Sequence, residues 1–217
     1  MPHGLFSVVV APARRAFALG FTAAVCLGLS GLLTACGPAS SASQAPAFKG
    51  IDVTGAAYGR QLALTDMTGH PRTLADYRGK VLMLYFGFVQ CPDVCPTALA
   101  RASEVMQQLG PDAAQVQLLF VTVDPERDTP ALLREYMAAF DPAFMGLTGD
   151  AAAIQAAASE FRVYFKKIPT GSSYTMDHTA LTYLLDRTGH IRVALRHEQT
   201  AADYTADIQK LLAEKPV

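Results

Sequence analysis

Two continuous apolar runs dominate the pattern of hydrophobic and polar positions along the chain. They are Lys80–Phe88 (KVLMLYFGF) and Val116–Val123 (VQLLFVTV), and each has the length of a single strand. A run of this kind indicates a strand that is buried on both faces of a sheet. A shorter strand is expected at Gln61–Thr65, followed by a turn at Asp66–Gly69. The pattern therefore predicts a sheet whose central strands are covered on both sides.

Helical spacing of apolar residues alternates with these strands. A helix that starts at a Ser, Thr or Asp cap, with proline in its first turn, is a common arrangement. On these signals we expect helices from about Thr97 to Leu109, from Thr129-Pro130 to near Asp141-Pro142, from Asp150 to about Glu160, and from Thr200 onward with Tyr204, Ile208 and Leu211 inward.

The remaining strands complete a recognisable order. Phe161–Lys166 is expected to return as a strand, and Ala180–Leu185 with Ile191–Leu195 to form a hairpin around Asp186–Gly189. The elements then run strand, helix, strand, helix, strand, strand, helix, with extra N-terminal strands and an inserted helix or hairpin. This order predicts an α/β, thioredoxin-like fold.

The first part of the chain has the pattern of an export signal. Arg14 and Arg15 precede the apolar run Ala16–Leu33, and Cys36 follows the small residues at its end. Such a signal, with a cysteine directly after it, resembles that of a bacterial lipoprotein. We therefore expect a signal peptide at 1–35, a lipidated Cys36 with a flexible tether at 36–48, and the folded domain at 49–217. An uncleaved signal anchor is the alternative, because the apolar run is just long enough to span a bilayer.

Charge and compartment limit the classes of function. Lys and Arg number 18 against 19 Asp and Glu, and they form no basic stripe, which argues against nucleic-acid binding. Either reading of the N-terminus exports the domain and anchors it to the outer, periplasmic face of the cytoplasmic membrane. Cleavage would remove Cys26 and leave Cys36, Cys91 and Cys95. Two free thiols are unusual in an oxidising compartment, so Cys91 and Cys95 are expected to form a disulfide, a redox pair or a metal site.

The cysteine pair lies where the strand Lys80–Phe88 leaves the predicted sheet and a helix begins. Open α/β sheets bind ligands at this edge, and a helix N-terminus lowers the pKa of a thiol. Pro96 is expected to keep Cys95 out of the helical conformation and to hold both sulfurs outward. Two thiolates favour Cu(I), with Zn(II) as a competitor. The three-residue spacing of Cys91 and Cys95 alone leaves metal binding and thiol–disulfide exchange equally open.

His178 is the candidate third ligand among five histidines. It directly precedes the strand Ala180–Leu185, and in a thioredoxin-like fold the segment entering that strand faces the cysteine loop. His70 and His190 follow turn glycines and are expected to be exposed. Asp177 is a candidate for orienting the imidazole of His178, and Asp124 would end a strand at the same edge.

These residues lie in motifs that resemble the Sco/SenC/PrrC family of copper chaperones for cytochrome c oxidase. The resemblance spans about Phe48 to Leu195. The motifs are Leu62–Asp66, Gly79–Val81, Tyr85–Phe88, Cys91–Thr97 (CPDVCPT), Val123–Pro130 (VDPERDTP) and Asp177–Thr179. The resemblance implies a thioredoxin-like fold with an added hairpin, and a copper site made by Cys91, Cys95 and His178.

The resemblance also implies what the protein does with the metal. Two thiolates and an imidazole suit Cu(I), and an added donor would suit Cu(II). The implied role is that of a metallochaperone, not an enzyme. Its recipient would be the binuclear copper (CuA) site of cytochrome c oxidase subunit II, which faces the same side of the membrane, and an upstream periplasmic copper chaperone is a further candidate partner.

Other functions use the same residues. An extracytoplasmic thiol–disulfide reductase would keep the recipient's cysteines reduced through Cys91 and Cys95 and would not need His178. A peroxide-reducing thiol enzyme fits less well, because no Thr-x-x-Cys motif is present. A copper sensor or storage protein would have the same ligands as a chaperone.

Overall fold

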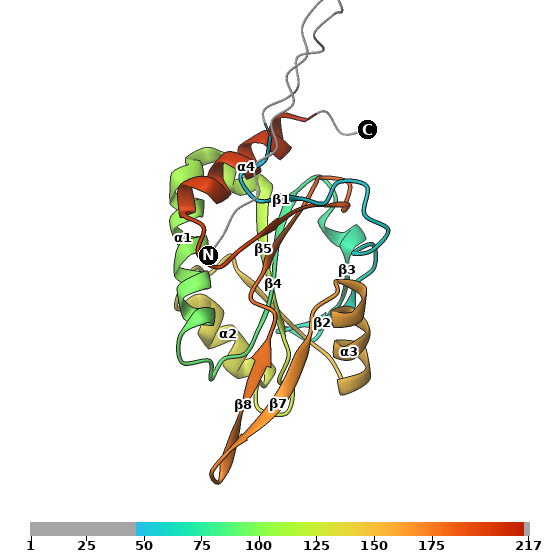
Figure 1. The fold of residues 1–217 in the computed structure, drawn as a ribbon, viewed down its shortest axis with the longest axis vertical. Coiled ribbons are helices and arrows are strands. Elements are labelled where there is room, and N and C mark those ends of the chain that lie inside the picture. Colours follow the sequence, from blue (N-terminus) through green and yellow to red (C-terminus); the bar gives the residue numbers. More distant parts are fainter. Residues whose placement is uncertain (1–46, 215–217) are drawn as a thin grey trace, which may run out of the picture. The chain divides into compact units, whose positions relative to one another are not determined.

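The structure is a computed structural model that describes residues 47–214 (Figure 1). The predicted signal peptide, Cys36 and most of the predicted tether lie outside these residues. Within 47–214, no helix is both long enough and apolar enough to cross a membrane.

One eight-stranded sheet forms the centre of the domain, in the strand order β1-β10-β9-β4-β5-β6-β2-β3. Its strands are β1 (Ile51–Asp52), β2 (Ala63–Asp66), β3 (Pro71–Thr73), β4 (Val81–Gly87), β5 (Val116–Thr122), β6 (Met145–Thr148), β9 (Thr182–Leu185) and β10 (Ile191–Leu195). Two more strands, β7 (Phe165–Thr170) and β8 (Ser173–His178), form a separate sheet. The helices are α1 (Val94–Leu109), α2 (Pro130–Ala138), α3 (Ala151–Glu160) and α4 (Ala201–Ala213), with short 3₁₀ helices at Leu74–Tyr77 and Gly110–Gln115.

The two predicted apolar runs form the buried centre of this sheet. β4 and β5 are parallel neighbours, and every residue of β4 is buried. β9 pairs antiparallel with the other edge of β4. Figure 1 shows α1, α2 and α4 on one side of the strands and α3 on the other. The predicted thioredoxin-like α/β fold with additional N-terminal strands is therefore confirmed.

The same five-residue turn closes two hairpins. Asp66–His70 joins β2 to β3, and Asp186–His190 joins β9 to β10, in both cases with the sequence Asp-x-Thr-Gly-His. In each turn the aspartate Oδ1 accepts hydrogen bonds from the threonine N–H, the threonine hydroxyl and the histidine N–H. Gly69 (φ 89°) and Gly189 (φ 86°) are left-handed, where a side chain would be strained. These turns were predicted, and both histidines are exposed as expected.

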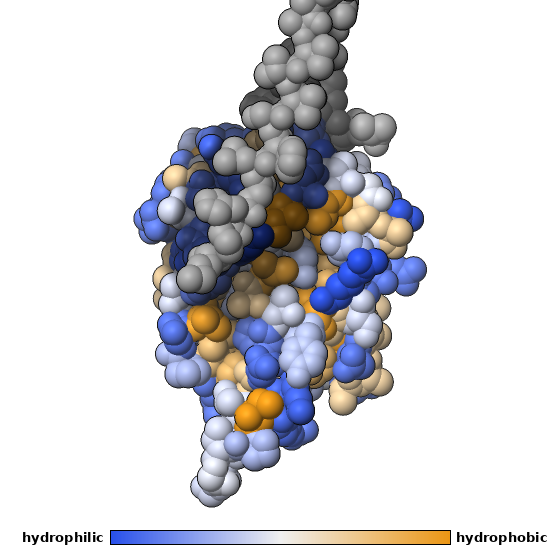
Figure 2. Space-filling view, in the orientation of Figure 1, coloured by the Kyte–Doolittle hydropathy of each residue, from blue (hydrophilic) through white to orange (hydrophobic). Residues whose placement is uncertain are grey.

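The predicted strand at Phe161–Lys166 is wrong. Arg162 takes a left-handed conformation (φ 55°), and the Val163 N–H closes a 2.7 Å hydrogen bond to the Ala158 carbonyl, so the chain is still leaving α3 there. β7 begins only at Phe165 and pairs with β8 in a separate two-stranded sheet. This β7–β8 hairpin protrudes from the rest of the domain (Figures 1 and 2). The short strand β6 was not predicted.

Candidate metal centre

Cys91 and Cys95 lie on either side of the start of α1. Cys91 is in the loop after β4, and Cys95 is the second residue of α1, which begins at Val94. The expectation that Pro96 keeps Cys95 out of the helix is wrong. A proline in the first turn of a helix lacks only an N–H that would have no partner within the helix, so the helix accommodates it. The Cys95 N–H instead donates to the Cys91 sulfur at 3.4 Å.

Both sulfurs are turned inward, contrary to the expected outward orientation. Cys91 is 8% exposed and Cys95 is fully buried. Gly87, at the end of β4, makes room for the second sulfur, since a Cβ there would lie 3.0 Å from the Cys95 Sγ. The Tyr85 hydroxyl donates to the same sulfur at 3.9 Å. Cys95 is thus held in a close-packed pocket that the apolar pattern of β4 did not reveal.

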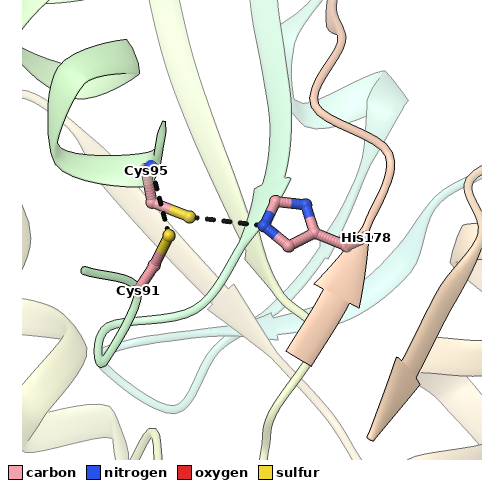
Figure 3. Close-up of side chains that lie close together, drawn as sticks. All are labelled: Cys91, Cys95 and His178. Atoms are coloured by element: carbon pink, nitrogen blue, oxygen red, sulfur yellow. Dashed lines mark hydrogen bonds between the residues drawn. The ribbon is translucent and has the colours of Figure 1, made fainter. Parts of the chain in front are cut away.

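His178 reaches the sulfurs from the last residue of β8. Its Nε2 lies 3.4 Å from the Cys95 Sγ, and its Nδ1 lies 3.1 Å from the Thr179 carbonyl oxygen (Figure 3). A carbonyl oxygen only accepts, so Nδ1 carries the proton and Nε2 presents its lone pair to the sulfurs. The rings of Tyr85 and Phe88 meet the imidazole edge to face, with centroids 6.2 Å and 5.8 Å away.

The three side chains form one compact group of ligand atoms. The two sulfurs and a nitrogen of His178 all lie within 4.8 Å of one another. Within residues 47–214 no other three His, Cys, Asp or Glu side chains gather in this way. The group joins the start of α1 to the end of β8, segments more than 80 positions apart in the sequence. Two sulfurs and an imidazole form a soft donor set of low coordination number.

The two thiols differ in acidity. The hydrogen bond from Cys95 lowers the pKa of Cys91 to about 4, against the effect of burial, and the backbone N–H groups of Asp93 and Cys95 lower it further. The same interaction with Cys91, together with burial, raises the pKa of Cys95. At neutral pH the pair therefore holds one thiolate, on Cys91, beside a protonated Cys95 that donates toward its neighbours.

Neither predicted carboxylate touches this group. Asp177 is exposed, and in the described residues the partner of the imidazole is the Thr179 carbonyl. Asp124 is buried and accepts hydrogen bonds from the Tyr174 hydroxyl and from Arg127. Asp124 therefore does not contact the sulfurs. It contacts Tyr174 of the β7–β8 hairpin and Arg127 of its own turn.

The sequence reasoning missed three residues that surround the group. Gly87 has a detectable signal, because a glycine inside a buried strand often marks a close approach of another group. Tyr85 lies in the apolar run Lys80–Phe88 and is buried, as that run predicts, but its hydroxyl also reaches a sulfur. Arg127 lies in the Val123–Pro130 motif, and nothing in the sequence shows where its guanidinium points.

The model of the SCO1/SenC family matches residues 52–213. This chain belongs to the SCO1/SenC family. Among solved structures, it is 44% identical to ScoI of Bradyrhizobium japonicum, determined with copper bound, with a TM-score of 0.67 over 72% of this chain and 100% of that one. Yeast Sco1, also determined with copper bound, is 34% identical, with a TM-score of 0.67 over 73% of this chain and 91% of the other.

Curated SCO1/SenC relatives are longer than the region they share with this chain. The mitochondrial SCO2 homolog of Bos taurus is 38% identical over 155 residues, which are 70% of this chain and 58% of that protein. The SCO2-like protein of Rickettsia felis is 35% identical over 134 residues, which are 60% of this chain and 65% of the other. The chain thus spans less than two thirds of the length of either.

Proposed function

We propose that this SCO1/SenC protein is a copper chaperone that binds one copper ion through Cys91, Cys95 and His178. The observation that supports this most directly is the convergence of two sulfurs and one imidazole nitrogen within 4.8 Å. The copper-bound structures of the Bradyrhizobium japonicum and yeast relatives support the choice of metal. Soft thiolates favour Cu(I), and the imidazole with one added donor would suit Cu(II).

The donor set suits a metal that must be handed on. Two thiolates and a neutral imidazole leave Cu(I) with few ligands, so an incoming donor can join before an outgoing one leaves. The Nδ1–H···O contact to Thr179 selects the tautomer of the neutral imidazole in which the Nε2 lone pair is aimed at the sulfurs. Cys91 ionises readily because its pKa is lowered to about 4. Of the three ligands, only Cys95, whose pKa is raised, must therefore lose a proton when copper binds.

The recipient and the location are part of the same proposal. We infer that the recipient is the CuA domain of cytochrome c oxidase subunit II, with an upstream periplasmic copper chaperone as donor. Lipidation at Cys36 would hold the domain at the outer face of the cytoplasmic membrane. A tether on the recipient's side raises the effective concentration of the two domains without new contacts between them.

The unequal acidity of the two thiols supports one alternative, an extracytoplasmic thiol–disulfide reductase. A thiolate on Cys91 would attack a target disulfide, and Cys95 would resolve the mixed disulfide. Burial of both sulfurs argues against this role, because a nucleophile that attacks a protein disulfide must reach it. In such a reductase His178 would be dispensable.

An anaerobic Cu(I) titration against a competing chelator tests the proposal. The full chain, reduced and copper-free, should bind one equivalent tightly, and Cys91→Ala, Cys95→Ala and His178→Ala should each abolish or severely weaken that binding. His190→Ala removes an exposed imidazole that is not part of the ligand group and should leave the affinity for Cu(I) unchanged. Tight binding that is indifferent to His178→Ala, together with turnover of a target disulfide by the copper-free chain, would favour the reductase.

A further inference from the structure

The β7–β8 hairpin that carries His178 is separate from the main sheet. Its residues pair only with one another, from Phe165 opposite His178 to Thr170 opposite Ser173. In the described part of the chain, no strand of the eight-stranded sheet is hydrogen-bonded to it. Figure 2 shows that it protrudes with a largely hydrophilic surface. The position of His178 therefore depends on whatever fixes the hairpin to the domain.

One turn, residues 124–127, supplies these attachments. The Tyr174 hydroxyl donates to Asp124 Oδ1 at 2.9 Å, and Arg127 Nη1 donates to the Tyr174 carbonyl at 2.8 Å. Lys167 pairs with Glu126 at 2.7 Å, but both side chains are exposed and such pairs contribute little. Within residues 47–214, the Cys95–His178 contact is the only other hydrogen bond between the hairpin and a distant part of the chain.

Packing behind the hairpin is incomplete. A cavity of about 460 Å³ is lined by Phe165, Lys166 and Met176 of the hairpin and by Ile154 and Gln155 of α3. Met176 is nevertheless buried, and Phe165 packs against the core, so apolar packing holds part of the hairpin. The contacts with the turn at 124–127 are its polar attachment beyond that packing.

Arg127 touches both segments that carry the candidate ligands. Its guanidinium stacks on the Tyr174 ring at 3.7 Å from the ring centroid, on the hairpin side. On the cysteine side, Nη1 donates to Gln90 Oε1 at 3.1 Å, directly before Cys91. The same guanidinium lies 6.0 Å from the centroid of Phe88, whose ring meets the His178 imidazole edge to face. An ion pair with buried Asp124 fixes its direction.

We propose that Arg127 is a positioning residue that holds the His178 hairpin against the cysteine loop and so limits the rate at which copper leaves. The proposal rests on the copper site of the preceding subsection. A planar guanidinium can stack on a ring while its separate nitrogens donate to several partners, whereas a lysine presents a single ammonium nitrogen and cannot reach Asp124, the Tyr174 carbonyl and Gln90 together. Arg127→Lys therefore keeps the charge beside Asp124 and loses the connection between the two segments.

The first test uses the reduced, copper-free chain. The imidazole of His178 lies beside two aromatic rings, so ring currents make its NMR shifts differ from those of an exposed histidine, and these shifts report the position of the hairpin. Arg127→Lys should move these shifts toward the values of exposed His190. Arg192→Lys is the matched control, because both arginine side chains are 17% exposed and paired with carboxylates, yet Arg192 contacts Asp186 and Glu214 instead of the site. Unchanged His178 shifts in Arg127→Lys would overturn the proposal.

The second test measures copper release to an excess of chelator. Arg127→Lys should speed release about tenfold, the equivalent of one charge-assisted hydrogen bond of roughly 1.4 kcal/mol, and Arg192→Lys should not. In a His178→Ala background the same substitution should add nothing, since the ligand it positions is gone. An equal acceleration in that background, or one equalled by Arg192→Lys, would overturn the proposal.

Two further results separate the positioning role from other failures. If Arg127→Lys unfolds the chain, Tyr174→Phe takes its place as the test variant. It removes only the hydroxyl that donates to Asp124, and it should shift the His178 signals toward those of an exposed histidine, by a smaller amount than expected for Arg127→Lys. If His178→Ala alone leaves copper release unchanged, the proposed copper site is wrong. The imidazole shifts of the copper-free Arg127→Lys chain would still decide whether Arg127 fixes the hairpin.

Discussion

Gly87→Ala is the substitution that tests the packing of Cys95 most sharply. A methyl group at this position would lie 2.9 Å from the rings of Phe120 and Tyr85 and 3.0 Å from the Cys95 Sγ, where ordinary contacts begin at 3.4 Å. All three neighbours are at most 1% exposed, so none can swing into solvent. Each must retreat by about 0.5 Å inside a close-packed core.

Both stability and copper binding should respond to this change. Overpacking of a core costs about 1 to 3 kcal/mol in the free energy of unfolding. Displacement of the ligand sulfur by about 0.4 Å is comparable to the tolerance of a preorganised site, and loss of such supporting contacts lowers metal affinity by about tenfold or more. We therefore expect Gly87→Ala to be destabilised and to bind Cu(I) about tenfold more weakly.

The assay pairs chemical denaturation of the reduced copper-free chain with a Cu(I) competition titration. Gly146→Ala is the matched control, because a Cβ on that strand glycine meets Leu133 at 3.2 Å and Met137 at 3.5 Å, away from the sulfurs. It should cost less stability and leave copper affinity unchanged. Wild-type copper affinity in Gly87→Ala, with stability equal to that of Gly146→Ala, would show that the space left by Gly87 does not position the Cys95 sulfur.

Three further predictions concern acidity and the N-terminal end of the domain. Burial raises the pKa of Asp66, but hydrogen bonds from Thr68 and Arg72 outweigh it and lower that pKa below the unfolded value of about 3.9. The carboxylate therefore stabilises the fold above about pH 4, and this stabilisation decreases as pH falls. In urea unfolding, Asp66→Asn should lower the free energy of unfolding by about 1 to 3 kcal/mol at neutral pH and by less at about pH 3. An equal loss at the two pH values would contradict this prediction. The Asp207 carboxylate accepts hydrogen bonds from the N–H groups of Lys49 and Gly50 at 2.7 Å and 2.9 Å. Asp207→Ala should lower the free energy of unfolding by about 1 to 3 kcal/mol and speed proteolysis near Gly50. Unchanged cleavage would show that Asp207 does not hold this segment in place. Because the pKa of Cys91 is about 4, its alkylation rate in reduced copper-free chain should stay flat between about pH 6 and 8, and a rate that rises like that of an ordinary thiol would rule this out.

The parts of the fold that could be predicted from the sequence are those decided by local pattern. The apolar runs that became β4 and β5 were placed to within one or two residues, because runs of this length are too short for a typical helix and fit a buried strand. The two Asp-x-Thr-Gly-His turns were found because glycine and aspartate mark turns through their own backbone preferences. In each case the signal lies within a few neighbouring residues.

The errors arose where distant contacts decide the structure. The strand expected at Phe161–Lys166 starts too early, because the exit of α3 through Arg162 has no clear sequence signal. The position of β8 was not expected, because within residues 47–214 it pairs only with β7. Pro96 was expected to keep Cys95 out of the helical conformation, although a proline in the first turn is compatible with a helix that begins at Val94. The inward orientation of the sulfurs depends on the space left by Gly87, which involves three other side chains.

The candidate site shows the same division. His178 was chosen because the predicted topology places the segment before β9 against the cysteine loop, and the structure brings its Nε2 to 3.4 Å from the Cys95 sulfur. Arg127 could not be chosen in this way. Its position depends on Tyr174, Gln90 and Asp124, which come from three separate segments.

The most direct test of the central claim is X-ray absorption at the copper edge of the chain loaded with one equivalent of Cu(I). We expect a first shell of two sulfur scatterers and one imidazole nitrogen, and loss of the imidazole contribution in His178→Ala but not in His190→Ala. A first shell made of sulfur alone, or a spectrum that His178→Ala leaves unchanged, would exclude His178 as a copper ligand.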